Sequence, residues 1–404
     1  KIKDIKNKAN VQFTLSIAVS NEGATDKEKY KSAQTAMDVI LGRGGDQAVI
    51  RENEIYKFFG GRAQEVEKRT KVKARVVAHA LENLIKESNK VMIMGHSNPD
   101  IDAMGSAMGI YRLVKELGKN AYIITSNETN TLQSFKESLL KDPEYEDILI
   151  TKEVAEENID ETTLLVVVDT NKVNYVEAPE ILTKTDKIVV IDHHRRSADY
   201  IENATLTFQE VYASSAAELV TEILQYVSIK INLKTIEAES LYAGIMMDTK
   251  NFTFKTGVRT FEAAAYLRKC GVDIIRVKKW FQSDLASFNK IAEIVKKAEI
   301  VNDSIAIASY NRKTKDASLI CAKAADELLT ISNITASFVL GNIGDKICIS
   351  GRSIGDINVQ IILEKLGGGG HITLAGAQLE GLTMDEGKEE LIIRIYEYFK
   401  LIDL

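Results

Sequence analysis

The stretch VMIMGHSNPDIDAMGSAMG, residues 91–109, decides the fold of the middle of this chain. An apolar run ends at Gly95, and His96, Asp100 and Asp102 follow it closely. Small residues then open a segment with helical spacing, so the pattern predicts a buried strand, a turn and a helix. One histidine and two carboxylates at the end of a buried strand raise the question of what they bind.

Three strand-like runs of the middle region end in an acid or a histidine. They are VMIMGH, ending at His96, LLVVVDT, which contains Asp169, and IVVIDHH, which ends in residues 192–194. Fully apolar strands that alternate with helices predict a parallel sheet covered on both faces. The carboxyl ends of parallel strands share one edge of such a sheet, so these polar residues should converge. A fourth acid, Asp248, follows the apolar helical segment ESLYAGIMM.

Each of these polar residues alone has an ordinary structural explanation as a helix cap or a hydrogen-bonded core residue. That explanation does not account for histidines and acids at the same edge of three successive strands. Carboxylates and imidazoles without thiolates favour Mn²⁺, Mg²⁺ or Co²⁺, and two such ions need roughly six ligands to serve attack on phosphorus. Gly95 and Pro99 would shape the turn so that Asp100 and Asp102 address different ions. The candidate ligands are His96, Asp100, Asp102, Asp169, His193 and Asp248.

Four motifs, HSNPDID, VVVDT, IDHHRR and MMDT, resemble in this order those of the DHH phosphoesterase superfamily. GRS (351–353), INVQIILEKLGG and GGGGH (367–371) are similar to the DHH-associated domain of one branch. The resemblance covers about residues 85–404. It implies an α/β fold with a doubly wound parallel-sheet domain, a smaller α/β domain, and the active site in the cleft between them.

The resemblance also implies a role for each matching residue. His96, Asp100 and Asp169 would hold one metal ion, and Asp169 would bridge to a second ion. Asp192 would orient a histidine without itself binding a metal ion, and His194 would face the substrate phosphate. The implied ligands of the second ion are Asp102, Asp169, His193 and Asp248, and the implied catalytic residues are Asp169, His193, His194 and Asp192.

The glycine run 367–370 permits two interpretations. A flexible linker is the ordinary one, but an apolar helix leads into the run and His371 closes it, which favours a substrate loop. Glycine amides can approach a phosphate closely, and Arg352 offers a cationic fork. The residues predicted to bind the substrate are Arg352, Ser353, Asn358, Gly369, Gly370 and His371.

Residues 1 to about 60 read as a small α/β piece. RGGDQAV (43–49) is similar to a nucleotide-cyclase signature, but Gln47 replaces the acid that should follow, and the stretch comes after a helix rather than in a hairpin. The piece resembles the C-terminal half of a degenerate GGDEF domain. The predicted domains are 1–61, GGDEF-like; 62–88, a helical linker; 89–301, the DHH catalytic domain; and 302–404, the DHH-associated substrate-binding domain.

This order of domains resembles the soluble part of GdpP-type cyclic-di-AMP phosphodiesterases. The resemblance implies hydrolysis of cyclic di-AMP to linear pApA by water activated between two divalent ions, with Mn²⁺ the expected metal. One alternative is a nanoRNase or pAp phosphatase acting on short linear oligonucleotides, which normally lacks the N-terminal piece. A second is a nucleotide sensor without turnover, which the complete ligand set opposes. A third, an inorganic pyrophosphatase, should lack GGGGH.

The composition of the chain limits its partners and its compartment. A net charge of −6 at pH 7 gives no electrostatic basis for binding duplex nucleic acid. Three widely spaced cysteines without a CxxC pair favour a reducing cytosol. The sequence begins at Lys1 without methionine and contains no long apolar run, so we expect a fragment of a membrane-anchored parent whose anchor lies upstream. The expected form is a homodimer at the cytoplasmic face of the cell membrane.

Overall fold

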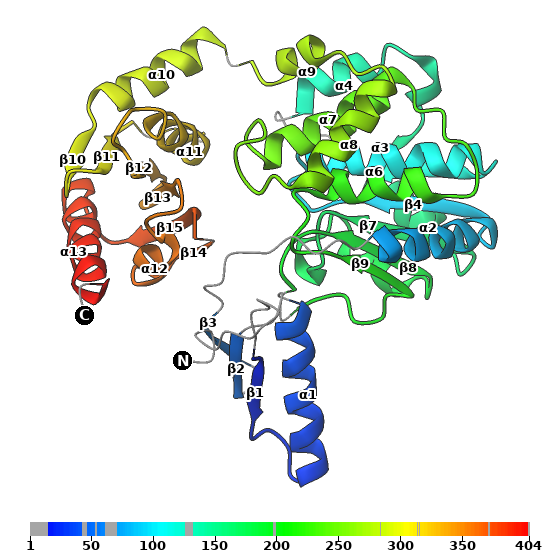
Figure 1. The fold of residues 1–404 in the computed structure, drawn as a ribbon, viewed down its shortest axis with the longest axis horizontal. Helices are drawn as coiled ribbons and strands as arrows, with labels where there is room; N and C mark the ends of the chain where they lie inside the picture. Colours follow the sequence, from blue (N-terminus) through cyan, green and yellow to red (C-terminus); the bar gives the residue numbers. More distant parts are fainter. Residues whose placement is uncertain are drawn as a thin grey trace, which may run out of the picture. The chain divides into compact units, whose positions relative to one another are not determined.

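The chain forms two compact units, Lys1–Phe281 and Gln282–Leu404, each with a six-stranded sheet (Figure 1). No helix among the residues with described coordinates is both long and apolar enough to cross a bilayer. The computed structural model describes residues 15–42, 47–52, 55–60, 71–125, 132–196, 199–282, 284–312, 314, 316–370 and 372–402.

The N-terminal piece is a three-stranded sheet with one helix. β1 and β2 pair in parallel, β2 and β3 pair antiparallel, and α1 packs Ala36 and Ile40 against Val49. The stretch RGGDQAV follows α1, as predicted, although its residues 43–46 lie outside the described residues. The elements are β1 (Ile17–Ser20), α1 (Asp26–Gly42), β2 (Gln47–Glu52) and β3 (Ile55–Gly60).

The central sheet of the first unit is entirely parallel, in the order β6-β5-β4-β7-β8-β9. The chain runs outward from β4 to β6 and then returns to place β7 on the other side of β4. The strand order therefore reverses between β4 and β7, which is the point where open parallel sheets bind ligands. The strands are β4 (Lys90–Met94), β5 (Asn120–Ile124), β6 (Leu149–Ile150), β7 (Thr163–Val168), β8 (Ile188–Asp192) and β9 (Leu206–Gln209).

Helices cover both faces of this sheet because its central strands β4, β7 and β8 are apolar on both sides. Val91 and Ile93 face the larger core with α2, α3 and α6, whereas Met92 and Met94 face a smaller core that includes α5. This arrangement confirms the predicted doubly wound sheet. The helices of the unit are α2 (Lys71–Lys86), α3 (Ile101–Glu116), α4 (Gln133–Leu139), α5 (Lys152–Asn158), α6 (Ala216–Tyr226), α7 (Thr235–Asp248), α8 (Val258–Lys269) and α9 (Ile274–Trp280), with short 3₁₀ turns at Pro143–Tyr145, Val173–Tyr175 and Pro179–Thr183.

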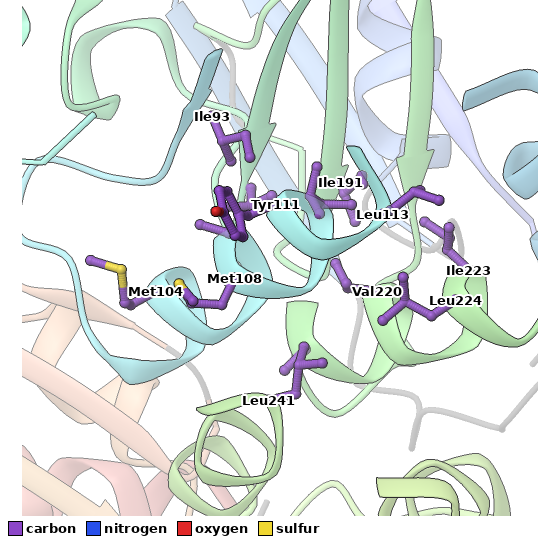
Figure 2. Close-up of a cluster of buried hydrophobic side chains, with 14 of the residues drawn as sticks. Ile93, Met104, Met108, Tyr111, Leu113, Ile191, Val220, Ile223, Leu224 and Leu241 are labelled. Atoms are coloured by element: carbon purple, nitrogen blue, oxygen red, sulfur yellow. The ribbon is translucent and has the colours of Figure 1, made fainter. Parts of the chain in front are cut away.

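Helix α3 is the centre of the larger core. In Figure 2, Met108 and Tyr111 of α3 lie between strand residues such as Ile93 on one side and Val220 of α6 and Leu241 of α7 on the other. Burying side chains of this size contributes roughly 1.5–3 kcal/mol each. The core therefore fixes α3, which carries one candidate ligand, Asp102, in its first turn and another, Asp100, at its N-cap.

The helix predicted to lie in a linker is part of the first unit's core. Ala74, Leu81 and Ile85 of α2 are fully buried and join the cluster that covers the central sheet. Amphipathic spacing shows that a helix has an apolar face, but it does not name the partner of that face. The predicted helical linker therefore contains a helix that packs on the central sheet, its bounds 62–88 stay a prediction, and residues 61–70 lie outside the described residues.

The second unit has a mixed sheet in the order β10-β11-β12-β13-β15-β14. β11 pairs in parallel with β12, and the other neighbours pair antiparallel. Helices α12 and α13 pack on one face, and α10 and α11 pack on the other. The elements are α10 (Leu285–Lys296), β10 (Glu299–Val301), β11 (Ile305–Tyr310), α11 (Ala317–Leu328), β12 (Ala336–Ile343), β13 (Lys346–Ser353), α12 (Val359–Glu364), β14 (Gly369–Gly370), β15 (Leu374–Glu380) and α13 (Met384–Ile402).

Helix α10 differs from its predicted assignment to the catalytic domain. Ile291 and Ile294 of α10 pack against α11 in the second unit's core, so this helix belongs to the second unit. The other predicted boundaries stay a prediction.

Candidate metal centre

The candidate ligands gather at the carboxyl edge of β4, β7 and β8, where the strand order reverses. Asp169 directly follows β7 and has a positive φ of 60°, a conformation that aspartate tolerates better than most residues. Its side chain is 2% exposed. Asp169 Oδ2 lies 3.5 Å from His96 Nε2, and Oδ1 lies 3.4 Å from His193 Nε2. The two oxygens of one carboxylate thus face two different histidines.

The first group of possible ligands is His96, Asp100 and Asp169. Asp100 Oδ2 lies 3.8 Å from His96 Nε2, and its other oxygen, Oδ1, accepts hydrogen bonds from the backbone N–H groups of Asp102 and Ala103. Oδ1 therefore caps helix α3, which leaves Oδ2 directed at the site.

The second group is Asp102, His193 and Asp248. His193 Nε2 lies 3.9 Å from Asp102 Oδ2 and 3.0 Å from Asp248 Oδ2. Asp102 comes from the first turn of α3, and Asp248 ends α7. The structure thus brings together all six residues that the sequence predicts as metal ligands.

Asp102 is held by the N-terminus of α6. The backbone N–H groups of Ala216 and Ala217 donate to its Oδ2 and Oδ1 at 2.8 Å and 2.9 Å. Helix α7 approaches closely at Gly244, where a Cβ atom would come within 2.6 Å of Asp102 Oδ1. Any larger residue at this position would displace the carboxylate.

Asp192 and His194 form a second layer beside Asp169. Asp192 Oδ1 lies 2.8 Å from His194 Nδ1 and also accepts from the His194 backbone N–H, while Asn171 donates to Oδ2. His194 Nδ1 is 3.6 Å from Asp169 Oδ1, and its side chain is 46% exposed. Asp192 is placed to orient an accessible imidazole beside the shared carboxylate.

The electrostatics of the site fit a bound cation. Burial raises the pKa of Asp102, and the charges of Asp169 and Asp248 raise it further. Burial lowers the pKa of His96, but hydrogen bonds to Asp100 and Asp169 outweigh burial and raise it to about 10. A divalent ion would relieve the repulsion among the carboxylates and displace the histidine proton.

The donor atoms themselves also fit a metal. Asp169 Oδ1 and His193 Nε2 are buried and make only ion-pair contacts of 3.0–3.9 Å, without a well-aligned hydrogen bond, within the described parts of the chain. Buried polar atoms are normally paired, so their shared direction toward the site favours a ligand between them. Oxygen and nitrogen donors without sulfur suit Mn²⁺ or Mg²⁺.

The predicted substrate residues of the second unit hold its own fold. The Arg352 side chain is 9% exposed, and its Nε donates to Asp326 Oδ1 at 3.0 Å. Ser353 Oγ accepts from the Gly355 backbone N–H, and Asn358 caps α12.

The glycine run is not a loose linker. Gly369 and Gly370 form β14, which pairs antiparallel with β15 and is exposed. A Cβ on Gly370 would lie 2.4 Å from the Leu374 carbonyl oxygen, whereas a Cβ on Gly369 would meet nothing within 4 Å. Gly370 is thus required by the sheet, and Gly369 faces open space. His371 lies outside the described residues.

Some residues of the site are absent from the sequence-based prediction. The ring of Tyr175 stacks on His96, with ring centroids 5.3 Å apart and an interplanar angle of 3°. The amides of Ala216 and Ala217 hold Asp102, and only the spacing of Ser215 and Glu218, which is typical of a helix N-terminus, could have indicated them. No sequence signal pointed to Tyr175.

Three family models match the chain. The DHH family N-terminal domain matches residues 90–245, the DHHA1 domain matches 302–401, and the GGDEF domain of GdpP-like cyclic-di-AMP phosphodiesterases matches 1–58.

Similar proteins agree with these domains. The chain is 43% identical over 403 residues to the cyclic-di-AMP phosphodiesterase GdpP of Geobacillus thermodenitrificans, with 99% of this chain and 61% of that protein covered. It is 41% identical over 406 residues to the cyclic-di-AMP phosphodiesterase PdeA of Listeria monocytogenes, with 99% of this chain and 62% of that protein covered. The chain thus spans about three-fifths of the length of these curated relatives.

A solved structure shares the fold. It is an exopolyphosphatase-related protein from Bacteroides fragilis, with a TM-score of 0.71 and 21% identity, and the match covers 85% of this chain and 100% of that one. The family matches and the relatives at 41–43% identity lead to one conclusion. The chain belongs to the DHH family, with a DHHA1 domain in its C-terminal part and a GdpP-like GGDEF domain ahead of both.

Proposed function

We propose that this chain is a metal-dependent phosphodiesterase that hydrolyses cyclic di-AMP to linear pApA. The observation that carries the proposal is Asp169, whose two oxygens lie 3.4 Å and 3.5 Å from the Nε2 atoms of His193 and His96. A carboxylate in this position suits a bridge between two cations. The two relatives named cyclic-di-AMP phosphodiesterases support the choice of substrate.

Two divalent ions, proposed to be Mn²⁺, would be held by the two ligand groups, and Asp169 of the first group would also be a ligand of the second ion. Bound ions of this kind polarise phosphoryl oxygens and supply a nucleophile at neutral pH. His194, fixed by Asp192 and nearly half exposed, is placed to donate a hydrogen bond to the phosphate under attack.

The second unit is proposed to bind the rest of the substrate. Gly369 is exposed and an added Cβ there would meet nothing within 4 Å, so a phosphate could approach this strand without a steric clash. Arg352 is nearly buried beside Asp326, so its proposed contact uses the part of the guanidinium that Asp326 does not hold. The full proposed set is Arg352, Ser353, Asn358, Gly369, Gly370 and His371.

Product analysis tests the function. Purified protein with Mn²⁺ is incubated with cyclic di-AMP, cyclic di-GMP, pApA and short linear oligonucleotides, and products are separated by ion-exchange chromatography. We expect pApA to accumulate from cyclic di-AMP before AMP appears. Faster cleavage of linear pApA than of the cyclic dinucleotide would favour the nanoRNase alternative, and binding without turnover would favour a sensor.

We further propose that the chain acts as a homodimer within a longer, membrane-anchored protein at the cytoplasmic face. Light scattering coupled to size-exclusion chromatography tests the dimer, and a mass equal to one chain at micromolar concentration would contradict it.

A further inference from the structure

A buried glutamate outside the metal centre, Glu218, connects two helix N-termini. It lies in the first turn of α6, and the residue is 1% exposed. Its Oε2 accepts hydrogen bonds from Ser214 Oγ and Thr260 Oγ1, both at 2.7 Å. Thr260 lies in the first turn of α8, so one carboxylate joins the start of α6 to the start of α8.

The start of α6 determines where Asp102 lies. The N–H groups of Ala216 and Ala217, in the same first turn as Glu218, donate to both oxygens of Asp102. A shift of this turn by a few tenths of an ångström would therefore move a metal ligand with it.

A connecting segment runs from the metal ligand Asp248, at the end of α7, to the first turn of α8. Thr260 Oγ1 accepts a hydrogen bond from the Gly257 backbone N–H at 3.1 Å while it donates to Glu218. Between Asp248 and Gly257, the chain holds three successive residues, 250–252, at positive φ values of 45–63°. Backbone in this unfavourable region persists only when its surroundings fix both ends.

The charge of Glu218 is only partly compensated inside the protein, because its nearest arginine is shared with Glu222. Arg259 Nε lies 3.8 Å from Glu218 Oε1, and the same guanidinium donates to both oxygens of Glu222 at 2.7 Å and 2.6 Å. Buried ion pairs contribute little net stability compared with apolar residues of similar volume. The buried charges of Glu218 and Arg259 beside the metal centre therefore favour a role in positioning metal ligands rather than in stabilising the fold.

We propose that Glu218, through the Thr260 hydroxyl, is a positioning residue that fixes the metal ligands Asp102 and Asp248 relative to each other. The proposal rests on the metal centre of the proposed function. Removing partners that orient metal ligands typically weakens metal affinity 10- to 100-fold. We expect a loss of this size in Glu218→Gln and in Thr260→Val, measured as Mn²⁺ dissociation constants by isothermal titration calorimetry.

Two further variants separate positioning from folding. Thr260→Ser keeps the hydroxyl and should bind Mn²⁺ within about threefold of the wild type. Glu82→Gln is the matched control, because Glu82 is also a buried glutamate that accepts a hydrogen bond from a hydroxyl, that of Ser228, but it lies on α2, which carries no metal ligand. It should lower the melting temperature of the metal-free protein and leave Mn²⁺ affinity unchanged.

The outcomes are distinct. Unchanged Mn²⁺ affinity in Thr260→Val, with a wild type that binds Mn²⁺, would overturn the positioning role and leave the proposed function standing. Weakened binding in Thr260→Ser equal to that in Thr260→Val would also overturn it, because the hydroxyl would then be irrelevant. A wild type that binds no Mn²⁺ would overturn the metal centre and this inference together.

Discussion

Replacing Asp169 by asparagine should nearly abolish turnover while the protein stays folded. Asparagine keeps the shape of the side chain, but it removes the negative charge and leaves one oxygen to face two histidines that lie 3.4 Å and 3.5 Å from the present oxygens. If one charged interaction is lost at each of two ions, at about 1.5–3 kcal/mol each, the barrier rises by about 3–6 kcal/mol. Each 1.36 kcal/mol is tenfold in rate, so kcat/KM should fall by roughly 10²- to 10⁴-fold.

The assay is steady-state hydrolysis of cyclic di-AMP with saturating Mn²⁺, and the melting temperature of the metal-free protein is measured in parallel. We expect this temperature to fall without loss of the folded state. Burial raises the pKa of Asp169, but its interactions with His193 and His96 outweigh burial and hold this pKa below its usual value, so the carboxylate stabilises the metal-free fold at neutral pH. The exposed Asp147→Asn is the matched control and should behave as wild type. Turnover by Asp169→Asn within tenfold of the wild type would refute the shared-carboxylate mechanism.

The remaining predictions concern the second unit and stability. Gly369→Ala places a methyl group in open space, so the melting temperature should stay unchanged. If a phosphate approaches this backbone, kcat/KM should fall at least tenfold, and full activity would exclude that approach. Arg352→Ala should lower kcat/KM by about 1–3 kcal/mol with Mn²⁺ affinity intact, and an equal loss in Asp326→Ala would show that Arg352 acts only through their ion pair. Burial raises the pKa of Glu82, but hydrogen bonds from Lys86 and Ser228 outweigh it and lower the pKa from 4.5 to about 2. The corresponding stability is present above pH 4.5 and lost as the pH falls toward 2, so the acid-induced drop in melting temperature should be shallower in Glu82→Gln.

The sequence predicts the centre of this protein well because its fold is encoded locally. Apolar strands that are buried on both faces carry a continuous signal, and the residue after each strand end is fixed in space by the sheet itself. The sequence alone could therefore place three residues at the carboxyl edge of the central sheet, namely His96, Asp169 and His193. Asp248 comes from a helix end rather than a strand end, and its convergence with the others depends on how α7 packs against α3.

Other parts depend on tertiary contacts that have no local signal. The amides that hold Asp102 belong to the alanines at 216 and 217, and a backbone donor has no characteristic side chain. Tyr175 reaches His96 because a short backbone bridge joins His96 to Val176, a contact between segments about 80 residues apart. Helix α2 shows the same limit, since its apolar face is visible in the sequence but its partner is not.

The double role of Asp100 affects how such a protein can lose its activity during evolution. One oxygen caps α3 and the other faces the metal centre, so selection for folding and selection for catalysis act on the same side chain. Asparagine and serine also cap helices well, whereas alanine there costs about 1 kcal/mol. A lineage drifting away from catalysis would therefore tend to replace this aspartate with a neutral capping residue. A neutral helix-capping residue at position 100, within otherwise intact motifs, would indicate a descendant that is folded but no longer catalytic.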